Sequence, residues 1–420
     1  MGMRSKKFSI GSTAILAIFT ITLFLTGPRA LGQQERVLHV FNNNGKDSEQ
    51  PSSSLIFDAA GNLYGTTSGG GVYRAGTAFE LSLSSSGWHE EELHNFGLNS
   101  VDGVSPAGGL IFDAAGNLFG TTTDGGLHGY GTVFELTPLA GGGSIEKVLH
   151  NFNNDGVDGI YPYGGVIFDG AGNLYGTASA GGVYGYGTVF ELTPTGTGGW
   201  QENVLHDFGV NGSDGVTPFA GVIFDAAGNL YGTTFNGGAD GGPNGGGTVF
   251  ELTSAGGGSW TETVLRSFVV NGRGGSNPGA LIVDASGNLY GPAFYGGSTG
   301  AGAVFELTHT AVGWMEKLLH NFQYSDGAFP NGLIFDAAGN LYGTTFSGGA
   351  YSFYGTVFEL SPTASGGWTQ KVLYSFNPNN SGGVSPAAGV ILDSSGNVYG
   401  TTSAGGNGFG TAFELLNFQP

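Results

Sequence analysis

Carboxylates recur at fixed spacings through the 420-residue sequence, and they are the first side chains that could do chemistry. Seven aspartates each begin a D-x-x-G-N pattern, at Asp58, Asp113, Asp169, Asp225, Asp284, Asp336 and Asp393. Acid–base catalysis needs carboxylates whose environments separate their pKa values, whereas these seven are equivalent. Aspartate at the start of a turn accepts hydrogen bonds from the turn amides. We therefore predict that they are structural turn residues.

A second set of aspartates stands four residues before a proline, at Asp47, Asp102, Asp158, Asp214 and Asp326. Segment 153–159 is superficially like a calcium-binding loop. No copy, however, has the complete D-x-[DN]-x-[DN]-G…E ligand set of such a loop. We predict solvated turns, and weak calcium binding is the alternative for Asp102, Asp158, Asp214 and Asp326.

Five histidines also recur, at His39, His94, His150, His206 and His320, with Arg266 and Tyr374 at the same position in two further copies. A metal ion needs several ligands within about 2 Å, and equivalent positions in successive copies lie far apart. We predict that these histidines are not metal ligands and that the protein has no cofactor. The absence of cysteine also excludes a Cys-ligated metal, a thiol nucleophile and a lipoprotein anchor. His128, near Asp124, is the one histidine that we would test as an acid or base.

A repeat of about 56 residues positions all of these side chains. Each copy contains D-x-x-G-N-[LV]-[YF]-G, then a block close to G-T-V-F-E-L, then a block close to L-H-N-F. Each block occurs seven times. The apolar and glycine-rich pattern predicts four short strands in each copy and almost no helix.

Seven copies of four antiparallel strands predict an all-β protein, a seven-bladed β-propeller that forms a single domain over residues 33–420. The last copy lacks its fourth strand, whereas residues 36–41 form a spare one near the N-terminus. Pairing of residues 36–41 with 410–415 would close the ring and leave no exposed strand edge at the seam.

Residues 1–32 have the pattern of a secretory signal peptide. They combine a basic start (4–7), an apolar run (14–25) that is short for a membrane span, and small residues before a predicted cleavage after Gly32.

Residues 33–420 hold eight Lys and Arg against 32 Asp and Glu, a net charge of −24. Such a charge repels nucleic acid and anionic lipid. We predict a secreted or periplasmic protein, monomeric, with no membrane span and no nucleic-acid partner.

The glutamate of each G-T-V-F-E-L block is predicted to face the fourth strand of its copy. A compact hairpin pairs Glu80, Glu135, Glu191, Glu251, Glu306, Glu359 and Glu414 with Glu91, Lys147, Asn203, Thr263, Lys317, Lys371 and Arg36. Four of these pairs join opposite charges, which is a stabilising arrangement of about 0.2–1 kcal/mol per pair.

The loops between the second and third strands carry Gly-Gly followed by aromatic residues, and one copy has an insertion at 240–246. Aromatic rings and carboxylates suit sugar or peptide recognition. The alternative is that the rings fold back over the glycines and fill gaps between blades. The candidate ligand face comprises Tyr73, Asp124, His128, Tyr130, Tyr184, Tyr186, Asp240, Tyr295, Tyr351, Phe353 and Tyr354.

The tandem G-[YF]-G-T-V-F-E-L-T and D-A-A-G-N-L-Y-G-T-T blocks resemble the choice-of-anchor GloVer tandem-repeat family over residues 33–420. The resemblance implies an exported bacterial protein of unknown activity. Members commonly carry a C-terminal sorting signal, and none is expected here because the sequence stops soon after the last copy. The D-x-x-G-N-L-Y element is also similar to NHL-type and gluconolactonase-type propellers.

Together these features predict a non-catalytic binding or scaffold module for a glycan or protein at the cell surface. The alternative is a metal-dependent enzyme of the lactonase or lyase type with its site at the central channel mouth. A purely structural role in an extracellular matrix is a third interpretation.

Overall fold

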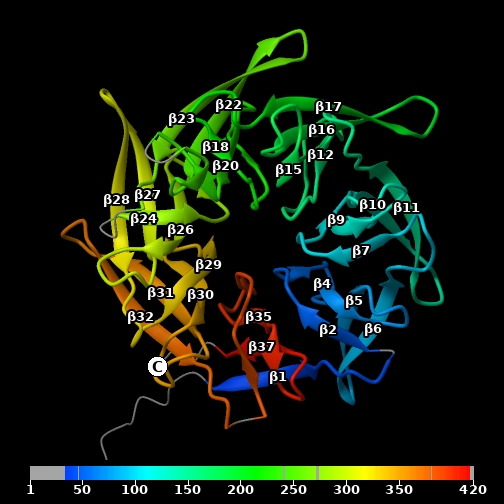
Figure 1. Ribbon diagram of the computed structural model, residues 1–420. Coiled ribbons are helices and arrows are strands. Elements are labelled where there is room, and N and C mark those ends of the chain that lie inside the picture. Colours follow the sequence, from blue (N-terminus) through cyan, green and yellow to red (C-terminus); the bar gives the residue numbers. More distant parts are fainter. Residues whose placement is uncertain (1–33, 46, 240–241, 271–273, 380, 417–420) are drawn as a thin grey trace, which may run out of the picture. The chain divides into compact units, whose positions relative to one another are not determined.

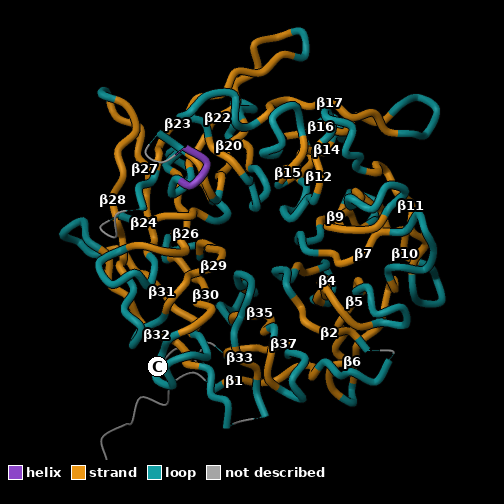
Figure 2. The backbone as a smooth tube through the Cα atoms, viewed as in Figure 1, coloured by secondary structure: helices purple, strands orange, loops and turns teal. Residues whose placement is uncertain are grey.

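Seven antiparallel sheets arranged around a central axis form a β-propeller (Figure 1). The computed structural model describes residues 34–45, 47–239, 242–270, 274–379 and 381–416, all within one unit that begins at Gln33. The predicted signal peptide (1–32) and Asp240 lie outside the described residues. Among the described residues the one helical element is the 3-10 turn η1 (Gly242–Asn244), which confirms the predicted all-β class (Figure 2). The arrangement of the sheets confirms the predicted seven blades.

Each of the first four blades comes from one continuous stretch of sequence. Blade 1 comprises β2 (Ser48–Pro51), β3 (Ile56–Phe57), β4 (Leu63–Gly70), β5 (Thr77–Ser84) and β6 (Gly87–Asn95). Blade 2 comprises β7 (Gly103–Pro106), β8 (Ile111–Phe112), β9 (Leu118–Gly125), β10 (Thr132–Pro138) and β11 (Ser144–Asn151). Blade 3 comprises β12 (Gly159–Ile160), β13 (Ile167–Phe168), β14 (Leu174–Ala178), β15 (Ala180–Gly181), β16 (Thr188–Pro194) and β17 (Trp200–Asp207). Blade 4 comprises β18 (Gly215–Val216), β19 (Ile223–Phe224), β20 (Leu230–Thr234), β21 (Asn236–Gly237), β22 (Thr248–Gly256) and β23 (Ser259–Ser267).

Blades 5 and 6 follow the same plan, and blade 7 joins the two ends of the described chain. Blade 5 comprises β24 (Gly275–Pro278), β25 (Ile282–Val283), β26 (Leu289–Gly296), β27 (Ala303–Thr310) and β28 (Gly313–Asn321). Blade 6 comprises β29 (Ala328–Phe335), β30 (Leu341–Ser347), β31 (Thr356–Pro362) and β32 (Trp368–Ser375). Blade 7 comprises β33 (Gly383–Val384), β34 (Ile391–Leu392), β35 (Val398–Thr402), β36 (Ala404–Gly405), β37 (Thr411–Leu415) and β1 (Glu35–Val40).

The ring closes by the predicted pairing of the N-terminal strand with the last blade. Strand β1 runs antiparallel to β37, with Glu35 opposite Leu415 and Val40 opposite Thr411. Arg36 donates to the Glu414 carboxylate at 3.0 Å. The first and last described strands therefore share one sheet (Figure 1).

The innermost strand of most blades differs from the prediction because it is split. In blade 1, β2 and β3 both pair with β4, and the residues between them interrupt the ladder. The first piece ends at a proline, which has no N–H to donate to the ladder. Residues expected in the connection between blades thus form part of the innermost strand, next to the axis.

The repeated aspartate stabilises its turn, as predicted. Asp169 Oδ1 accepts hydrogen bonds from the N–H groups of Ala171 and Asn173, both at 2.8 Å. Its Oδ2 accepts from the Asn173 side chain at 2.8 Å and from the Tyr175 hydroxyl at 3.3 Å. The carboxylate is therefore occupied by local donors.

The predicted cross-strand partners of the seven glutamates are confirmed in register. Ion pairs of 4.0 Å or less form in three blades, at Arg36–Glu414, Lys147–Glu135 and Lys317–Glu306. Their cations are about half exposed, so each contributes little.

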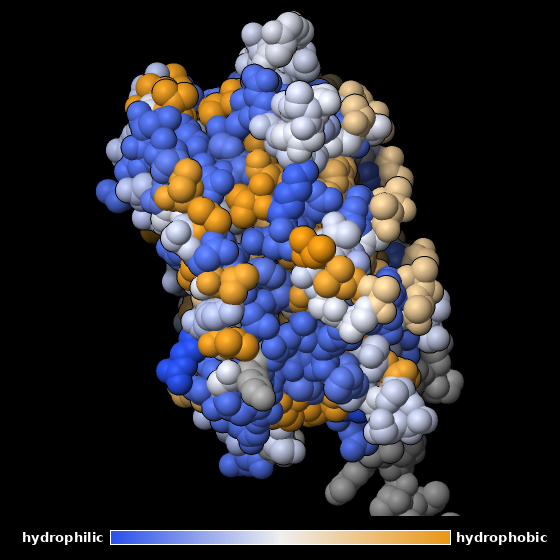
Figure 3. Space-filling model, turned by 90° about the vertical axis from the view of Figure 1, so that its right-hand side faces the viewer, coloured by the Kyte–Doolittle hydropathy of each residue, from blue (hydrophilic) through white to orange (hydrophobic). Residues whose placement is uncertain are grey.

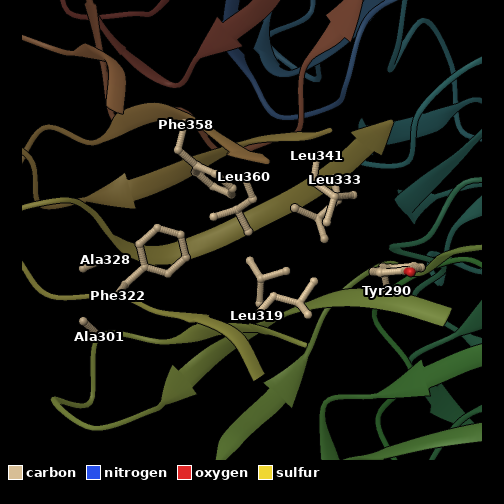
Figure 4. Packing of buried hydrophobic residues seen from close by; sticks show 10 residues of the cluster. Tyr290, Ala301, Leu319, Phe322, Ala328, Leu333, Leu341, Phe358 and Leu360 are labelled. Carbon is tan, nitrogen blue, oxygen red and sulfur yellow. The ribbon is translucent and has the colours of Figure 1, made fainter. Parts of the chain in front are cut away.

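The core lies between neighbouring blades. Figure 4 shows one such cluster, in which Leu319 and Phe322 of blade 5 face Phe358 and Leu360 of blade 6. The rings of Phe322 and Phe358 lie 5.0 Å apart, edge to face. Fully buried rings of this kind recur at the blade interfaces and supply large apolar areas.

The outer surface on one side of the molecule mixes hydrophilic and apolar residues (Figure 3). The side shown in Figure 3 has separate apolar spots and no continuous apolar area. Among the described residues there is no helix of the length and hydropathy needed to cross a membrane.

Glu35 makes the closing blade sensitive to pH. It accepts hydrogen bonds from Tyr374 and from the Gly383 N–H, and burial raises its pKa from the ordinary 4.5 despite these bonds. A carboxyl with a raised pKa binds its proton more tightly in the folded state, so this contribution is present below pH 4.5 and is lost as pH rises through the raised value. We expect Glu35→Gln to lessen the loss of stability with rising pH just above 4.5, as measured by urea unfolding. Tyr374→Phe removes a hydrogen bond that lowers the pKa of Glu35, so stability should fall over a wider pH range above 4.5. If the unaltered protein and both variants show the same dependence of unfolding free energy on pH, Glu35 is not the group responsible.

Candidate functional site

The innermost strands surround a cavity of about 870 Å³ on the propeller axis. Its lining residues come from all seven blades, so the cavity lies at the centre of the ring of blades that Figure 1 shows, and we call it the central channel. Small residues such as Gly108, Gly164 and Gly221 bring the blades close together there, since a Cβ at Gly221 would lie 2.7 Å from the Gly165 carbonyl. All seven blades therefore line the same cavity.

A strained residue before a proline shapes the channel mouth in each blade. This residue has φ between 55° and 62°, the left-handed region, and occurs at Gln50, Ser105, Tyr161, Thr217, Asn277, Phe329 and Ser385. Its N–H donates to a carbonyl of the preceding blade, for example Tyr161 to Tyr130 at 3.0 Å. Such strain persists only where surrounding contacts enforce it. The turn links neighbouring blades and exposes the residue after the proline to the channel.

Blades 3 to 6 place a continuous series of rings at this mouth. Tyr163 and Phe219 follow the prolines of blades 3 and 4, whereas Phe235 comes directly after β20 of blade 4 and Phe294 lies near the end of β26 of blade 5. Successive ring centroids lie 5.0, 5.4 and 6.4 Å apart, and Phe294 stacks on Phe329 at 5.2 Å. We call these five residues the aromatic arc. Tyr163 and Phe219 are 44% and 39% exposed, so part of each ring is accessible at the mouth.

Blades 1 and 2 line the opposite part of the mouth with small polar residues. Thr123 donates from its hydroxyl to the Asp124 carboxylate at 2.9 Å and reaches the Ser105 carbonyl at 3.1 Å. Ser52 Oγ is buried and has no hydrogen-bond partner among the described residues. Asp124 is the one carboxylate among the described lining residues. The mouth therefore combines an aromatic half with a hydroxyl-rich half.

The structure brings two of the sequence-predicted candidates to this mouth. Asp124 lines it directly, and the Tyr295 ring packs on Phe294 at 4.9 Å and on Phe329 at 5.5 Å. The cavity lining does not include the other described candidates, which are Tyr73, His128, Tyr130, Tyr184, Tyr186, Tyr351, Phe353 and Tyr354.

Some of those rings cover the backbone, as the alternative interpretation expects. A Cβ at Gly209 would collide with the Tyr186 ring, which lies directly over that glycine. Tyr130 packs against Tyr161 at 5.8 Å. Phe353, by contrast, is 71% exposed.

The aromatic arc was not predicted from the sequence, although a signal for it exists. The residue after the repeated proline is Ser52, Ala107, Tyr163, Phe219, Gly279, Asn331 or Ala387. The residue after the second-strand G-T-T pattern is Ser68, Thr123, Ser179, Phe235, Phe294, Phe346 or Ser403. Aromatic residues at these two positions are confined to blades 3 to 6, and they include four of the five arc residues together with Phe346, whereas Phe329 stands before its proline. This break in symmetry could have been found.

A second group of ionisable residues lies between blades, away from the channel. A histidine of one blade, the aspartate of the following connection and a glutamate of the next blade come together four times. We call these the His–Asp–Glu clusters: His39–Asp47–Glu90, His94–Asp102–Glu146, His150–Asp158–Glu202 and His206–Asp214–Glu262. The candidate calcium residues Asp102, Asp158 and Asp214 are thus directed at histidines.

A β-bulge in each fourth strand produces this arrangement. Glu146 and His150 are four residues apart on β11, so regular alternation would place them on one face. Leu149 is an extra residue opposite β10, and it turns His150 to the other face. Glu146 consequently faces His94 of the preceding blade, and His150 faces Glu202 of the next.

The environment of each cluster shifts its pKa values. Burial, together with the neighbouring aspartate, raises the pKa of Glu146 to about 8, of Glu202 to about 9 and of Glu262 to about 7. Burial opposes the charged form of His39, but hydrogen bonds to Asp47 and Glu90 outweigh it and raise its pKa to about 9. In each cluster two carboxyl groups therefore lie within reach of one imidazole.

The other three interfaces depart from this set. Arg266 replaces the histidine and lies 2.5 Å from Glu316, and Gly274 stands where the aspartate would be. Tyr374 donates to Glu35 at 2.8 Å, with Gly382 at the aspartate position. His320 keeps Asp326 at 3.2 Å, but Gln370 replaces the glutamate.

Three solved structures are similar to this chain at low identity. The extracellular domain of a protein described as a hybrid two-component system from B. thetaiotaomicron is 12% identical, with a TM-score of 0.56, over 92% of this chain and 40% of that chain. PorZ, a surface component of the type-IX secretion system of Porphyromonas gingivalis, is 14% identical, with a TM-score of 0.47, over 86% of this chain and 46% of that chain. A gluconolactonase from Xanthomonas campestris is 16% identical, with a TM-score of 0.34, over 58% of this chain and 73% of that chain. This chain spans less than half of the first of these structures.

The sequence comparisons agree with the resemblance carried by the repeated blocks. The curated proteins give no match to this sequence. The repeat described as Gloeobacter/Verrucomicrobia repeat matches residues 17–242 and 239–418, and the chain therefore belongs to this repeat family.

Proposed function

We propose that the protein is an exported, monomeric, non-catalytic binding module that holds a neutral saccharide at the channel mouth. The observation that carries this proposal is the aromatic arc, a series of rings confined to one side of an otherwise repeated ring of blades. In a symmetric scaffold, an unrepeated surface is the place where selection for a ligand would act.

The chemistry of the mouth suits a sugar. Aromatic rings offer rigid apolar faces that pack against the C–H faces of a pyranose, and nearby hydroxyl and carboxylate groups bond to its hydroxyls. Tyr163 and Phe219 supply the exposed rings, whereas Asp124 supplies an exposed carboxylate across the mouth. The net charge of −24 for residues 33–420 disfavours an anionic polysaccharide and favours a neutral one.

Export is supported by two features of the sequence. Residues 1–32 follow the pattern of a secretory signal peptide, and the repeat blocks resemble those of exported bacterial proteins. We propose that the propeller acts in the periplasm or outside the cell.

The enzyme alternative has less support at the channel. A lactonase- or lyase-type site needs several metal ligands around one ion. Among the described lining residues, Asp124 is the one carboxylate and none is a histidine. The clusters that do combine such groups lie between blades and do not line the cavity.

A glycan array followed by calorimetric titration of its best ligand tests the proposal. We expect the double variant Tyr163→Ala/Phe219→Ala to bind that ligand at least tenfold more weakly, a loss of about 1.4 kcal/mol, because it removes two exposed rings. Phe353→Ala is the matched control, since it deletes a more exposed ring that does not line the cavity.

The control should keep the affinity of the unaltered protein, and both variants should keep its melting temperature. The proposal fails if the array shows no saccharide binding, or if Phe353→Ala weakens binding as much as the double variant does. Binding of a protein partner alone at this mouth would also contradict it.

A further inference from the structure

We propose that each His–Asp–Glu cluster binds one divalent transition-metal ion of the zinc class, so that up to four ions join neighbouring blades. The ligands would be the histidine Nε2 and one carboxylate oxygen each from the aspartate and the glutamate. Such ions would be structural, and they would be independent of the channel mouth.

The distances within the clusters fit three ligands of one ion. Histidine Nε2 lies 3.4, 3.4, 3.1 and 3.4 Å from the aspartate oxygens of the four clusters in chain order. It lies 3.2, 3.9 and 3.7 Å from the glutamate oxygens of the first three. Metal–ligand bonds of 2.0–2.2 Å in a tetrahedron place the ligand atoms roughly 3.3–3.5 Å apart. A hydrogen bond from an imidazole N–H is generally shorter than most of these separations.

The imidazole N–H alone does not satisfy both carboxyl groups of a cluster. A neutral imidazole whose Nε2 is protonated has one hydrogen there, so it serves one carboxylate fully. The carboxyl groups of Asp158 and Glu202 are also within hydrogen-bonding reach of one another, so one of them must carry a proton unless a cation lies between them.

Several carboxylate oxygens in the clusters have no partner among the described residues. They include Oδ1 of Asp158 and of Asp214, although these residues are only 7% and 3% exposed, and Oε1 of Glu146, Glu202 and Glu262. His206 Nε2 likewise has no hydrogen bond among the described residues despite lying 3.4 Å from Asp214. Buried polar atoms without partners call for a water molecule, a proton or a cation, and one cation would serve the three groups of a cluster together.

The three irregular interfaces act as comparisons within the same chain. Where Arg266 supplies a permanent positive charge, the aspartate position holds Gly274 and Glu316 is the one carboxylate left. Where Tyr374 replaces the histidine, the aspartate is again absent. Two carboxylates therefore occur together only at interfaces that keep the histidine, which is the arrangement expected if a cation completes the set.

The ligand set favours zinc-like ions over calcium. Calcium takes six to eight oxygen ligands, whereas zinc accepts imidazole nitrogen together with carboxylate oxygen in fourfold coordination. The histidine side chains keep 10–20% exposure, which leaves room for an ion and a water molecule to enter.

The test uses the full-length protein, purified without a histidine tag, stripped with a chelator and then equilibrated with Zn²⁺ at pH 7.5. We expect elemental analysis to find up to four ions per chain, and a higher melting temperature than in the stripped protein. The double variant His150→Gln/Glu202→Gln should bind one ion fewer. His320→Gln is the matched control, because its interface has Gln370 as the third residue, and it should bind as many ions as the unaltered protein.

A gain of binding provides a test that does not depend on damaging a cluster. Gln370→Glu would complete the set formed by His320 and Asp326, so it should raise the zinc content by one ion per chain. The proposal is overturned if the unaltered protein holds less than one ion with Zn²⁺ in excess and its melting temperature does not respond. It is equally overturned if Ca²⁺ displaces Zn²⁺, or if both His150→Gln/Glu202→Gln and Gln370→Glu leave the zinc content unchanged.

Discussion

Gly176→Ala is expected to destabilise the protein by about 1–3 kcal/mol, although it adds a single methyl group to the middle of a strand. Gly176 of β14 pairs directly with Phe190 of β16. A Cβ at this position would lie 2.6 Å from Cζ of Phe190 and 3.1 Å from Val166 Cγ1. Phe190 is fully buried against Phe152 of blade 2, so the ring cannot move aside without disturbing the interface with the preceding blade.

Gly170→Ala is the matched control. Gly170 lies in an exposed turn where a methyl group would have no atom within 4 Å, and five other blades have alanine at this position. It should change stability by no more than about 0.5 kcal/mol. Phe190→Leu in the Gly176→Ala background removes the colliding ring edge and should recover part of the loss. Urea unfolding measures all three; equal stability of Gly176→Ala and Gly170→Ala would show that the glycine is not required by the ring.

The architecture could be predicted because the sequence contains the same structural information seven times. A single G-T-V-F-E-L block is a weak signal for a strand, but seven copies at nearly constant spacing fix the blade number and the hairpin register. Constant hairpin length is what correctly placed Lys147 opposite Glu135 and Arg36 opposite Glu414. The predicted fold class, blade number and closing strand were right for this reason.

The His–Asp–Glu clusters could not be predicted, because they depend on a local irregularity and on a neighbour outside the repeat. The prediction considered only whether equivalent histidines of successive blades could meet one another, and these positions lie far apart. The meeting of His150 with Glu202 of the next blade was not foreseen, since regular alternation would keep His150 on the same face as Glu146. The bulge at Leu149 changes the face, and no residue type in the sequence marks it uniquely.

The channel mouth was partly predictable. Asp124 was found because it departs from its counterparts in a loop that was expected to face a ligand. Tyr163 and Phe219 were missed because the residues around the repeated proline were assigned to a connection, whereas they lie beside the innermost strand. A non-glycine residue with positive φ before proline is uncommon, so residue preferences did not favour the observed turn.

Deletion of residues 33–41 is expected to have the largest effect of any change considered, a loss of cooperative unfolding or strong aggregation. These residues include β1, which supplies the fourth strand of blade 7 and covers β37. Leu38 and Phe41 are buried between blades 7 and 1, and each contributes about 1.5–3 kcal/mol through apolar burial. The free energy of unfolding of a native protein is about 5–15 kcal/mol. Losing the burial of these two side chains and the pairing of β1 with β37 would remove much of it. Without β1, the edge of β37 would also be open to pairing with other chains.

A rearranged chain separates the need for the strand from the need for its position in the sequence. Leu192 and Glu202 of blade 3 pair in the same register as Leu415 and Glu35 of blade 7, and residues 193–201 connect them. A chain that starts at Asn42 and continues after Leu415 through a copy of 193–201 into residues 35–41 should restore the missing strand as an ordinary hairpin. We expect this permuted protein to unfold cooperatively near the temperature of the unaltered one, as measured by calorimetry, whereas the deletion does not. An unchanged melting curve for the deletion would show that the ring does not depend on its closing strand.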